Sequence, residues 1–191
     1  MSATGDLPSG VVGDYPDWFY YPSPAEPPAW VSDFVDAVGS VRQMIESRTV
    51  DALTSDVVLS YLRPGLVELG YEVEAGKHKA EKIRRPVLFG ERGIPRVAYE
   101  VDAVHDDLGI LVEVEAGRGA RGNAVYRDLV RTSLIVGARF LVLGVMQEYR
   151  HMSGGKPVAV SSYRDAKDQL DAVFASGRLE LPFEGVLLFG Y

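Results

Sequence analysis

Two short segments in which hydrophobic and acidic residues alternate, residues 99–104 and 110–116, constrain the fold of this chain most. Alternation with a period of two is typical of β-strands that bury one face. The intervening Asp106-Asp107-Leu108-Gly109 is typical of a tight turn. If these four residues form the loop of a hairpin, His105 pairs with Ile110. The sequence therefore predicts an antiparallel hairpin with one apolar and one acidic face.

The same register brings carboxylates together on the acidic face. It places Asp102 opposite Glu113, with Glu115 on the same face and Glu100 opposite Glu115. Like charges at this spacing repel, so a positive partner is expected among them. The chain has no cysteine and three histidines, which leaves Mg²⁺ or Mn²⁺ held by oxygen atoms as the natural candidate. The alternative is a solvated edge hairpin whose acids face water and pair occasionally with Arg118 or Lys82.

The rest of the chain favours an α/β fold with a mixed sheet. Residues 1–30 are rich in proline and aromatic residues and are expected to form an extended arm. Residues 31–191 are expected to form a single domain. Helices are predicted over 31–48, 55–69, 124–136 and 163–175, and strands over 71–75, 86–90, 96–104, 109–116, 140–146 and 185–189.

The order and spacing of the acidic residues resemble a known family. Asp102, ten intervening residues, Glu113-Val114-Glu115, and then a helix and an apolar strand resemble the PD-(D/E)xK nuclease superfamily. The resemblance covers roughly residues 55–146 and implies a restriction-endonuclease-like fold, in which an acidic β-hairpin is flanked by helices. Two positions depart from the pattern. Val101 replaces the usual proline, and Glu115 replaces the usual lysine, as in a minority of restriction endonucleases whose motif ends in E-x-E.

The resemblance also implies roles for the residues of this motif. Asp102 and Glu113 would be metal ligands, with the main-chain carbonyl of Val114 as a further ligand. Glu115 would stand where a lysine orients the attacking water, and would act as a base or as another ligand. The implied chemistry is metal-assisted hydrolysis of a phosphodiester bond. Families of this kind often add an acid from the first helix, for which the candidates are Asp56 and Glu68.

Basic segments flank the acidic hairpin. The net charge of −7 resides in residues 1–60, which carry nine acidic and two basic residues. Residues 76–99 contain seven basic and two acidic residues, and residues 117–131 contain four basic and one acidic. Since phosphate contacts dominate affinity for nucleic acids, this pattern favours DNA as the partner, although each residue alone is typical of a solvated surface. The expected nucleic-acid-binding residues are Lys77, Lys79, Lys82, Arg84, Arg118, Arg121, Asn123 and Arg127.

A glycine-rich segment, residues 117–122, offers a competing interpretation. It matches G-x-G-x-x-G between a predicted strand and a predicted helix, which is the context of a dinucleotide-binding loop. However, a pyrophosphate there would be repelled by Glu113 and Glu115 on the preceding strand, and too few residues follow for the second half of such a fold. We favour a turn that lets the backbone approach a phosphate at a helix N-terminus, such as a DNA phosphate.

The function predicted from the sequence is that of a Mg²⁺-dependent DNA endonuclease of the restriction or repair type, acting as a homodimer. The alternative is a nuclease fold that has lost activity and serves as a DNA-binding or protein-interaction module. The glutamate at position 115, in place of lysine, motivates that alternative. No apolar run is long enough to cross a bilayer and residues 1–10 do not resemble a secretion signal, so a cytoplasmic location is the default expectation.

Overall fold

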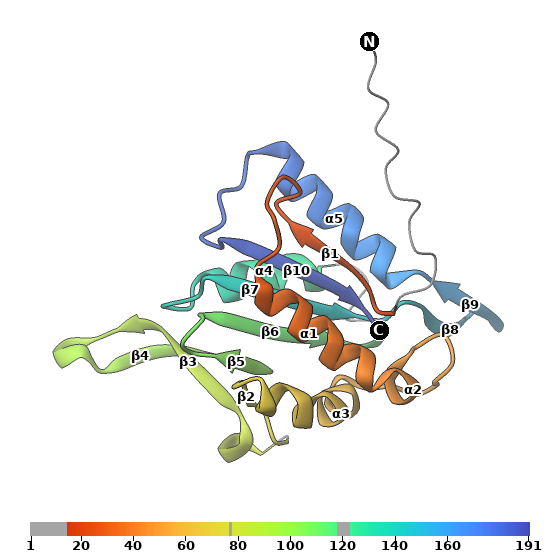
Figure 1. The fold of residues 1–191 in the computed structure, drawn as a ribbon, viewed down its shortest axis with the longest axis horizontal. Helices are drawn as coiled ribbons and strands as arrows, with labels where there is room; N and C mark the ends of the chain where they lie inside the picture. Colours follow the sequence, from red (N-terminus) through yellow and green to blue (C-terminus); the bar gives the residue numbers. More distant parts are fainter. Residues whose placement is uncertain (1–14, 77, 118–122) are drawn as a thin grey trace, which may run out of the picture.

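The computed structural model describes residues 15–76, 78–117 and 123–191, and its centre is a six-stranded mixed sheet (Figure 1). The strands follow the order β1-β10-β7-β6-β5-β2. The central β6, β7 and β10 are parallel, and the outer strands are antiparallel to their neighbours. The bounds are β1 (Asp17–Tyr21), β2 (Glu72–Val73), β5 (Ala103–His105), β6 (Ile110–Glu115), β7 (Phe140–Val145) and β10 (Gly185–Gly190). Because β7 and β10 are buried along their whole length, their sequences are continuously apolar rather than alternating.

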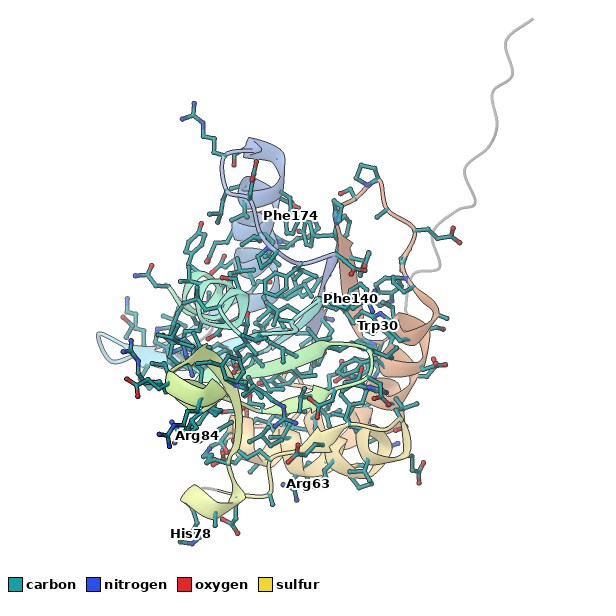
Figure 2. All side chains as sticks on the ribbon, turned by 90° about the vertical axis from the view of Figure 1, so that its left-hand side faces the viewer. Trp30, Arg63, His78, Arg84, Phe140 and Phe174 are labelled. Carbon is teal, nitrogen blue, oxygen red and sulfur yellow. The ribbon has the colours of Figure 1, made fainter. Side chains whose placement is uncertain are left out.

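Helices cover both faces of the sheet (Figure 1). On one face lie α1 (Ala29–Ser40), the short α2 (Arg42–Ile45) and α3 (Ser55–Glu68), and on the other lie α4 (Ala124–Ser133) and α5 (Ser162–Ser176). Each face has its own hydrophobic core. In the first, Trp30 packs edge-on against Phe140, with their ring centroids 5.4 Å apart (Figure 2). Of the two capping candidates in the sequence, Thr54 and Ser55, Thr54 caps α3 by accepting a hydrogen bond from the backbone N–H of Val57.

Two β-hairpins project from the ends of this layered body (Figure 1). One is formed by β3 (Ile83–Phe89) and β4 (Pro95–Val101), with the 3₁₀ turns η1 (Lys79–Glu81) before it and η2 (Glu91–Gly93) at its tip. The other is formed by β8 (Tyr149–Ser153) and β9 (Lys156–Val160). Among the described helices, none combines the length and apolar character that crossing a membrane requires.

The predicted α/β class with a mixed central sheet and flanking helices is confirmed. The predicted hairpin register is also confirmed, because Ala103, Val104 and His105 pair with Val112, Leu111 and Ile110. A single strand over residues 96–104 is wrong, since the chain leaves one sheet and enters another at Asp102. A continuous helix over residues 31–48 is also wrong, since Val41 adopts a non-helical conformation between α1 and α2.

Candidate active site

Asp102 lies where the projecting β3–β4 hairpin joins the central sheet. The preceding residue ends β4, which pairs with β3, and the following residue begins β5, which pairs with β6. Both main-chain groups of Asp102 are hydrogen-bonded: its N–H donates to the carbonyl of Val112 (3.2 Å), and its carbonyl accepts from the N–H of Glu74 (2.8 Å). The side-chain Oδ2 accepts a hydrogen bond from the N–H of Val114 (2.7 Å). The carboxylate is therefore held alongside β6 by backbone contacts.

Glu113 and Glu115 come from β6, the neighbouring strand. Val112 and Val114 alternate with them and face the core under α1 and α3, so the two glutamates face α4 on the other side of the sheet. Glu113 is 7% exposed, and Glu115 is partly exposed at the end of the strand. The sequence prediction that Asp102, Glu113 and Glu115 converge is consistent with these positions. Glu100, expected opposite Glu115, pairs instead with Arg84 in the β3–β4 hairpin, because the chain changes sheets at Asp102.

A fourth carboxylate, Glu74, joins this group and was missed by the sequence analysis. It directly follows β2, is only 3% exposed, and forms a close ion pair with the ammonium of Lys82. The sequence shows only that Glu74 lies in the predicted strand 71–75, and no local pattern places that strand beside β5. Lys82, predicted to contact DNA, is thus placed among the carboxylates.

Burial raises the pKa of the Asp102 carboxyl to about 6. The negative charges of Glu74 and Asp128 act in the same direction. The hydrogen bond from Val114 and the positive charge of Lys82 oppose them but do not cancel the effect. The charged form of Asp102 is therefore disfavoured in the fold without additional positive charge.

The pKa values of Glu113 and Glu115, the two glutamates of β6, are also raised. Burial, together with the charges of Asp102 and Asp128, raises the pKa of Glu113 well above its ordinary value. Burial and Asp128 raise the pKa of Glu115 to about 7, although Arg127 opposes this rise. A group of carboxyls with raised pKa values is typical of a functional site rather than of a solvated hairpin.

Helix α4 supplies a fully buried acid and its counter-ion. Asp128 is bound by Arg127 through two contacts, Nε to Oδ1 at 2.9 Å and Nη2 to Oδ2 at 3.2 Å. The same guanidinium forms an ion pair with Glu115. Arg127, predicted to contact DNA, is therefore engaged inside the candidate site.

The remaining predicted residues fall into three groups. Asp56 on α3 lines a small pocket together with Glu74, whereas Glu68 is exposed at the end of that helix. Arg84 is exposed on β3 (Figure 2), and Asn123 is exposed at the N-cap position of α4 without a capping hydrogen bond from its side chain. Of the predicted DNA-binding residues, Lys77, Arg118, Arg121 and the side chain of Lys79 lie outside the described part of the chain.

The donor atoms of the site suit a hard divalent cation only in part. Within residues 15–76, 78–117 and 123–191, no three acidic or histidine side chains are arranged as a ready-made metal site. Mg²⁺ commonly keeps several waters and binds through one or two carboxylates, so Asp102 and Glu113 with the carbonyl of Val114 match its usual requirement. The raised pKa values of both carboxyls indicate that a cation would relieve a charge imbalance there.

Comparison with known proteins gives a match in structure but not in sequence. No family model and no curated protein sequence matches the chain. Its structure is similar to the crystal structure of the restriction endonuclease BglII in complex with a DNA 16-mer, with a TM-score of 0.52 and 14% sequence identity. The aligned region covers 92% of this chain and 75% of BglII. The chain has a restriction-endonuclease-like fold. At this level of identity the similarity establishes the fold, and the roles of individual residues depend on the geometry described above.

Proposed function

We propose that this protein is a metal-dependent DNA endonuclease of the restriction or repair type, which hydrolyses phosphodiester bonds at the Asp102–Glu113–Glu115 site. The observation that supports the proposal is the raised pKa of Asp102, Glu113 and Glu115, which lie at the end of the β3–β4 hairpin and on β6, within a restriction-endonuclease-like fold. BglII, which shares this fold, was crystallised with DNA. The proposed cofactor is Mg²⁺ or Mn²⁺, and the proposed partner is DNA.

Each residue of the site has a defined part in this proposal. Asp102 and Glu113, with the carbonyl of Val114, would hold the cation, which supplies a water of lowered pKa and offsets the charge of the phosphate. The pKa of Glu115, about 7, suits a general base that takes the proton from the attacking water near neutral pH. Lys82 offsets part of the negative charge of Glu74 and Asp102.

The proposed DNA contacts are the exposed Arg84 and Asn123. Further contacts are proposed for four basic residues predicted from the sequence: Lys77, Lys79, Arg118 and Arg121. Phosphates are bound by Lys and Arg side chains and by backbone N–H groups. Lys82 and Arg127 each have a carboxylate partner in the site, so their contribution to DNA affinity would require exchange of that partner for a phosphate.

The test is cleavage of supercoiled plasmid and of linear single- and double-stranded DNA in the presence of Mg²⁺ or Mn²⁺. Wild type is compared with Asp102→Asn, Glu113→Gln and the control Asp107→Asn, an exposed aspartate in the turn of the same hairpin. The proposal expects metal-dependent cutting that is lost in the first two variants and retained in the control. DNA binding should persist in Asp102→Asn, because removing an acid reduces repulsion with phosphate.

A second candidate function is a nuclease fold without activity that binds DNA or protein. It is favoured by the ion pair between Arg127 and Glu115, which occupies the glutamate standing in the lysine position. Under this alternative, no substrate is cut, and calorimetry shows no heat of Mg²⁺ or Mn²⁺ binding that depends on Asp102. Cleavage that depends on both Asp102 and Glu113 would refute it.

A further inference from the structure

The β3–β4 hairpin carries its outermost residues away from the rest of the molecule (Figure 1). Its inner part is held to the body, because the N–H of Val136 donates a hydrogen bond to the carbonyl of Pro86 (2.9 Å). Residues 88–96 are here called the outer hairpin, and all of them are exposed. In the described part of the chain, no hydrogen bond or ion pair joins the outer hairpin to an element other than β3, η2 and β4. The outer hairpin is therefore a two-stranded ribbon with solvent on both faces.

Large apolar side chains are exposed on the outer hairpin. Leu88 is 43% exposed, Phe89 is 45% exposed and Ile94 is 64% exposed. Phe89 and Ile94 stand directly before and after the turn formed by residues 90–93, and Phe89 lies opposite the exposed Pro95. A ribbon that is exposed on both faces has no core in which to bury these side chains. Their position at the end of a projecting hairpin is typical of a surface that enters a partner.

Positive charge accompanies these apolar side chains. Arg92 lies in the turn and Arg96 lies on β4, and both are exposed. Among the residues that the structure describes, neither arginine has an ion-pair partner, whereas Arg85, nearer the base of the hairpin, has two carboxylate partners. Residues 84–96 contain four basic residues and one acidic residue. The outer hairpin therefore places its apolar side chains among cations that are available to an anionic partner.

The length of the hairpin allows one DNA duplex to contact both the outer hairpin and the candidate site. β4 has 7 residues, which at about 3.3 Å each span roughly 23 Å between the turn and Asp102. One helical turn of DNA is about 34 Å long. DNA bound at Asp102, as the proposed function requires, therefore comes within reach of the outer hairpin.

We propose that the outer hairpin inserts Phe89 and Ile94 as an apolar wedge between base pairs of double-stranded DNA, while Arg92 and Arg96 bind the flanking phosphates. The inference rests on the proposed function, because it takes DNA as the partner, and it adds the form of the substrate: a duplex that bends at the wedge. An uncharged apolar groove of a protein would leave both arginines without partners.

The proposed wedge implies a preference among DNA sequences. Proteins that insert apolar side chains between base steps from the minor groove kink the duplex by about 20–90°. Pyrimidine–purine steps such as TA kink easily, whereas A-tracts are stiff. The expected substrate is therefore a duplex with a flexible step where the outer hairpin enters it.

The test measures bending and unstacking of DNA in a chelating buffer, so that cleavage is not required. The probe is a duplex of about 30 base pairs, roughly three helical turns, with a donor and an acceptor fluorophore at its ends and 2-aminopurine beside a central TA step. Bound wild type should increase energy transfer, because bending brings the ends together. It should also increase 2-aminopurine fluorescence, because the base loses its stacking. A duplex with an A-tract in place of the TA step should bind more weakly.

The wedge variant carries Phe89→Ser and Ile94→Ser together. Its control is Val67→Ser on α3, a valine that is 54% exposed outside the hairpin. The wedge variant should bind the duplex at least about tenfold more weakly and should lose both fluorescence changes, and the control should keep them. Because all three substituted residues are exposed, circular dichroism should show the same folded state for each protein.

The phosphate contacts have a separate readout. Arg92→Gln and Arg96→Gln should each reduce the slope of log K against log salt concentration by about 1, because each removes one phosphate contact. The control is Arg178→Gln, which removes an exposed arginine beyond the end of α5 and should leave the slope unchanged.

Three results would overturn the inference. The first is a wedge variant that bends the duplex as wild type does, and the second is a wild type that binds the duplex without either fluorescence change. The third is unchanged DNA binding by the wedge variant together with loss of binding to vesicles of phosphatidylserine and phosphatidylcholine, which would assign the outer hairpin to a lipid surface.

Failure of the proposed nuclease function gives a different result. A protein that bends DNA through Phe89 and Ile94 but cuts no DNA with Mg²⁺ or Mn²⁺ supports the wedge and refutes the nuclease. A protein that binds no duplex even at low salt refutes both the wedge and DNA as the partner.

Discussion

Replacing Asp102 by asparagine should make the protein more stable above neutral pH. The side chain is buried beside other carboxylates, and its pKa is raised from 3.8 to about 6. The folded state therefore binds the Asp102 proton more tightly than the unfolded state does. By linkage, the free energy of unfolding falls as pH rises from about 4 to about 6. Above that range the whole loss of stability caused by the charged Asp102 carboxylate is present.

The expected stabilisation by Asp102→Asn follows from the size of the pKa shift of Asp102. About two pKa units correspond to about 3 kcal/mol at 1.36 kcal/mol per unit. For a chain of this length, 1 kcal/mol changes Tm by about 2–4 °C, so Asp102→Asn should raise Tm by roughly 6–12 °C at about pH 8. Asparagine retains an oxygen that can accept the hydrogen bond from the N–H of Val114, so this contact is not lost.

The assay is thermal unfolding followed by circular dichroism, in a chelating buffer, between about pH 4 and pH 8, the range over which the Asp102 penalty develops. The control is Asp107→Asn, which removes an exposed carboxylate from the same hairpin. The stabilisation by Asp102→Asn should shrink as the pH is lowered towards 4. Added Mg²⁺ should raise the Tm of wild type and have less effect on the variant, because the cation relieves the same repulsion.

Two results would refute this reasoning. The first is an Asp102→Asn variant that is no more stable than Asp107→Asn at pH 8. The second is a stabilisation that does not change with pH, which would mean that it arises from packing rather than from charge.

Three further substitutions test other parts of the structure. Arg127→Met should lower the free energy of unfolding by about 2–4 kcal/mol, measured in urea, because it leaves the buried Asp128 without its cation; addition of Asp128→Asn should restore part of the loss. Gly144→Ala should destabilise by about 1–3 kcal/mol, since the new Cβ would lie 2.4 Å from Cζ of Phe189; an unchanged urea midpoint would contradict the packing. Thr54→Ala should cost about 1 kcal/mol through loss of the α3 cap, while Thr54→Ser should cost less.

The sequence was informative where structure is determined locally. The turn at residues 106–109 and the alternation on either side predict the hairpin register and hence the approach of Asp102 to Glu113. The continuous apolar stretch over residues 140–146 predicts a buried strand, which is β7. These features depend on neighbouring residues or on simple periodicity, and for that reason they can be read without a structure.

The sequence was less informative where distant segments meet. Glu74 reaches the site because β2 pairs with β5, and no local pattern specifies this pairing. Lys82 and Arg127 look like surface cations in the sequence, yet the packing of their elements turns them towards Glu74 and Asp128. Net charge along the chain describes composition, whereas the choice of ion-pair partners is a property of the tertiary structure.

The position of Asp102 between two sheets has a mechanical consequence. The projecting β3–β4 hairpin joins the central sheet at Val101, the residue directly before Asp102. Hydrogen bonds to Val112, Val114 and Glu74 hold Asp102 to the central sheet, so a displacement of the outer hairpin is expected to bend the backbone at Val101 and to leave the carboxylate beside β6. A molecule bound far out on the hairpin can therefore displace it without changing the spacing between Asp102 and Glu113.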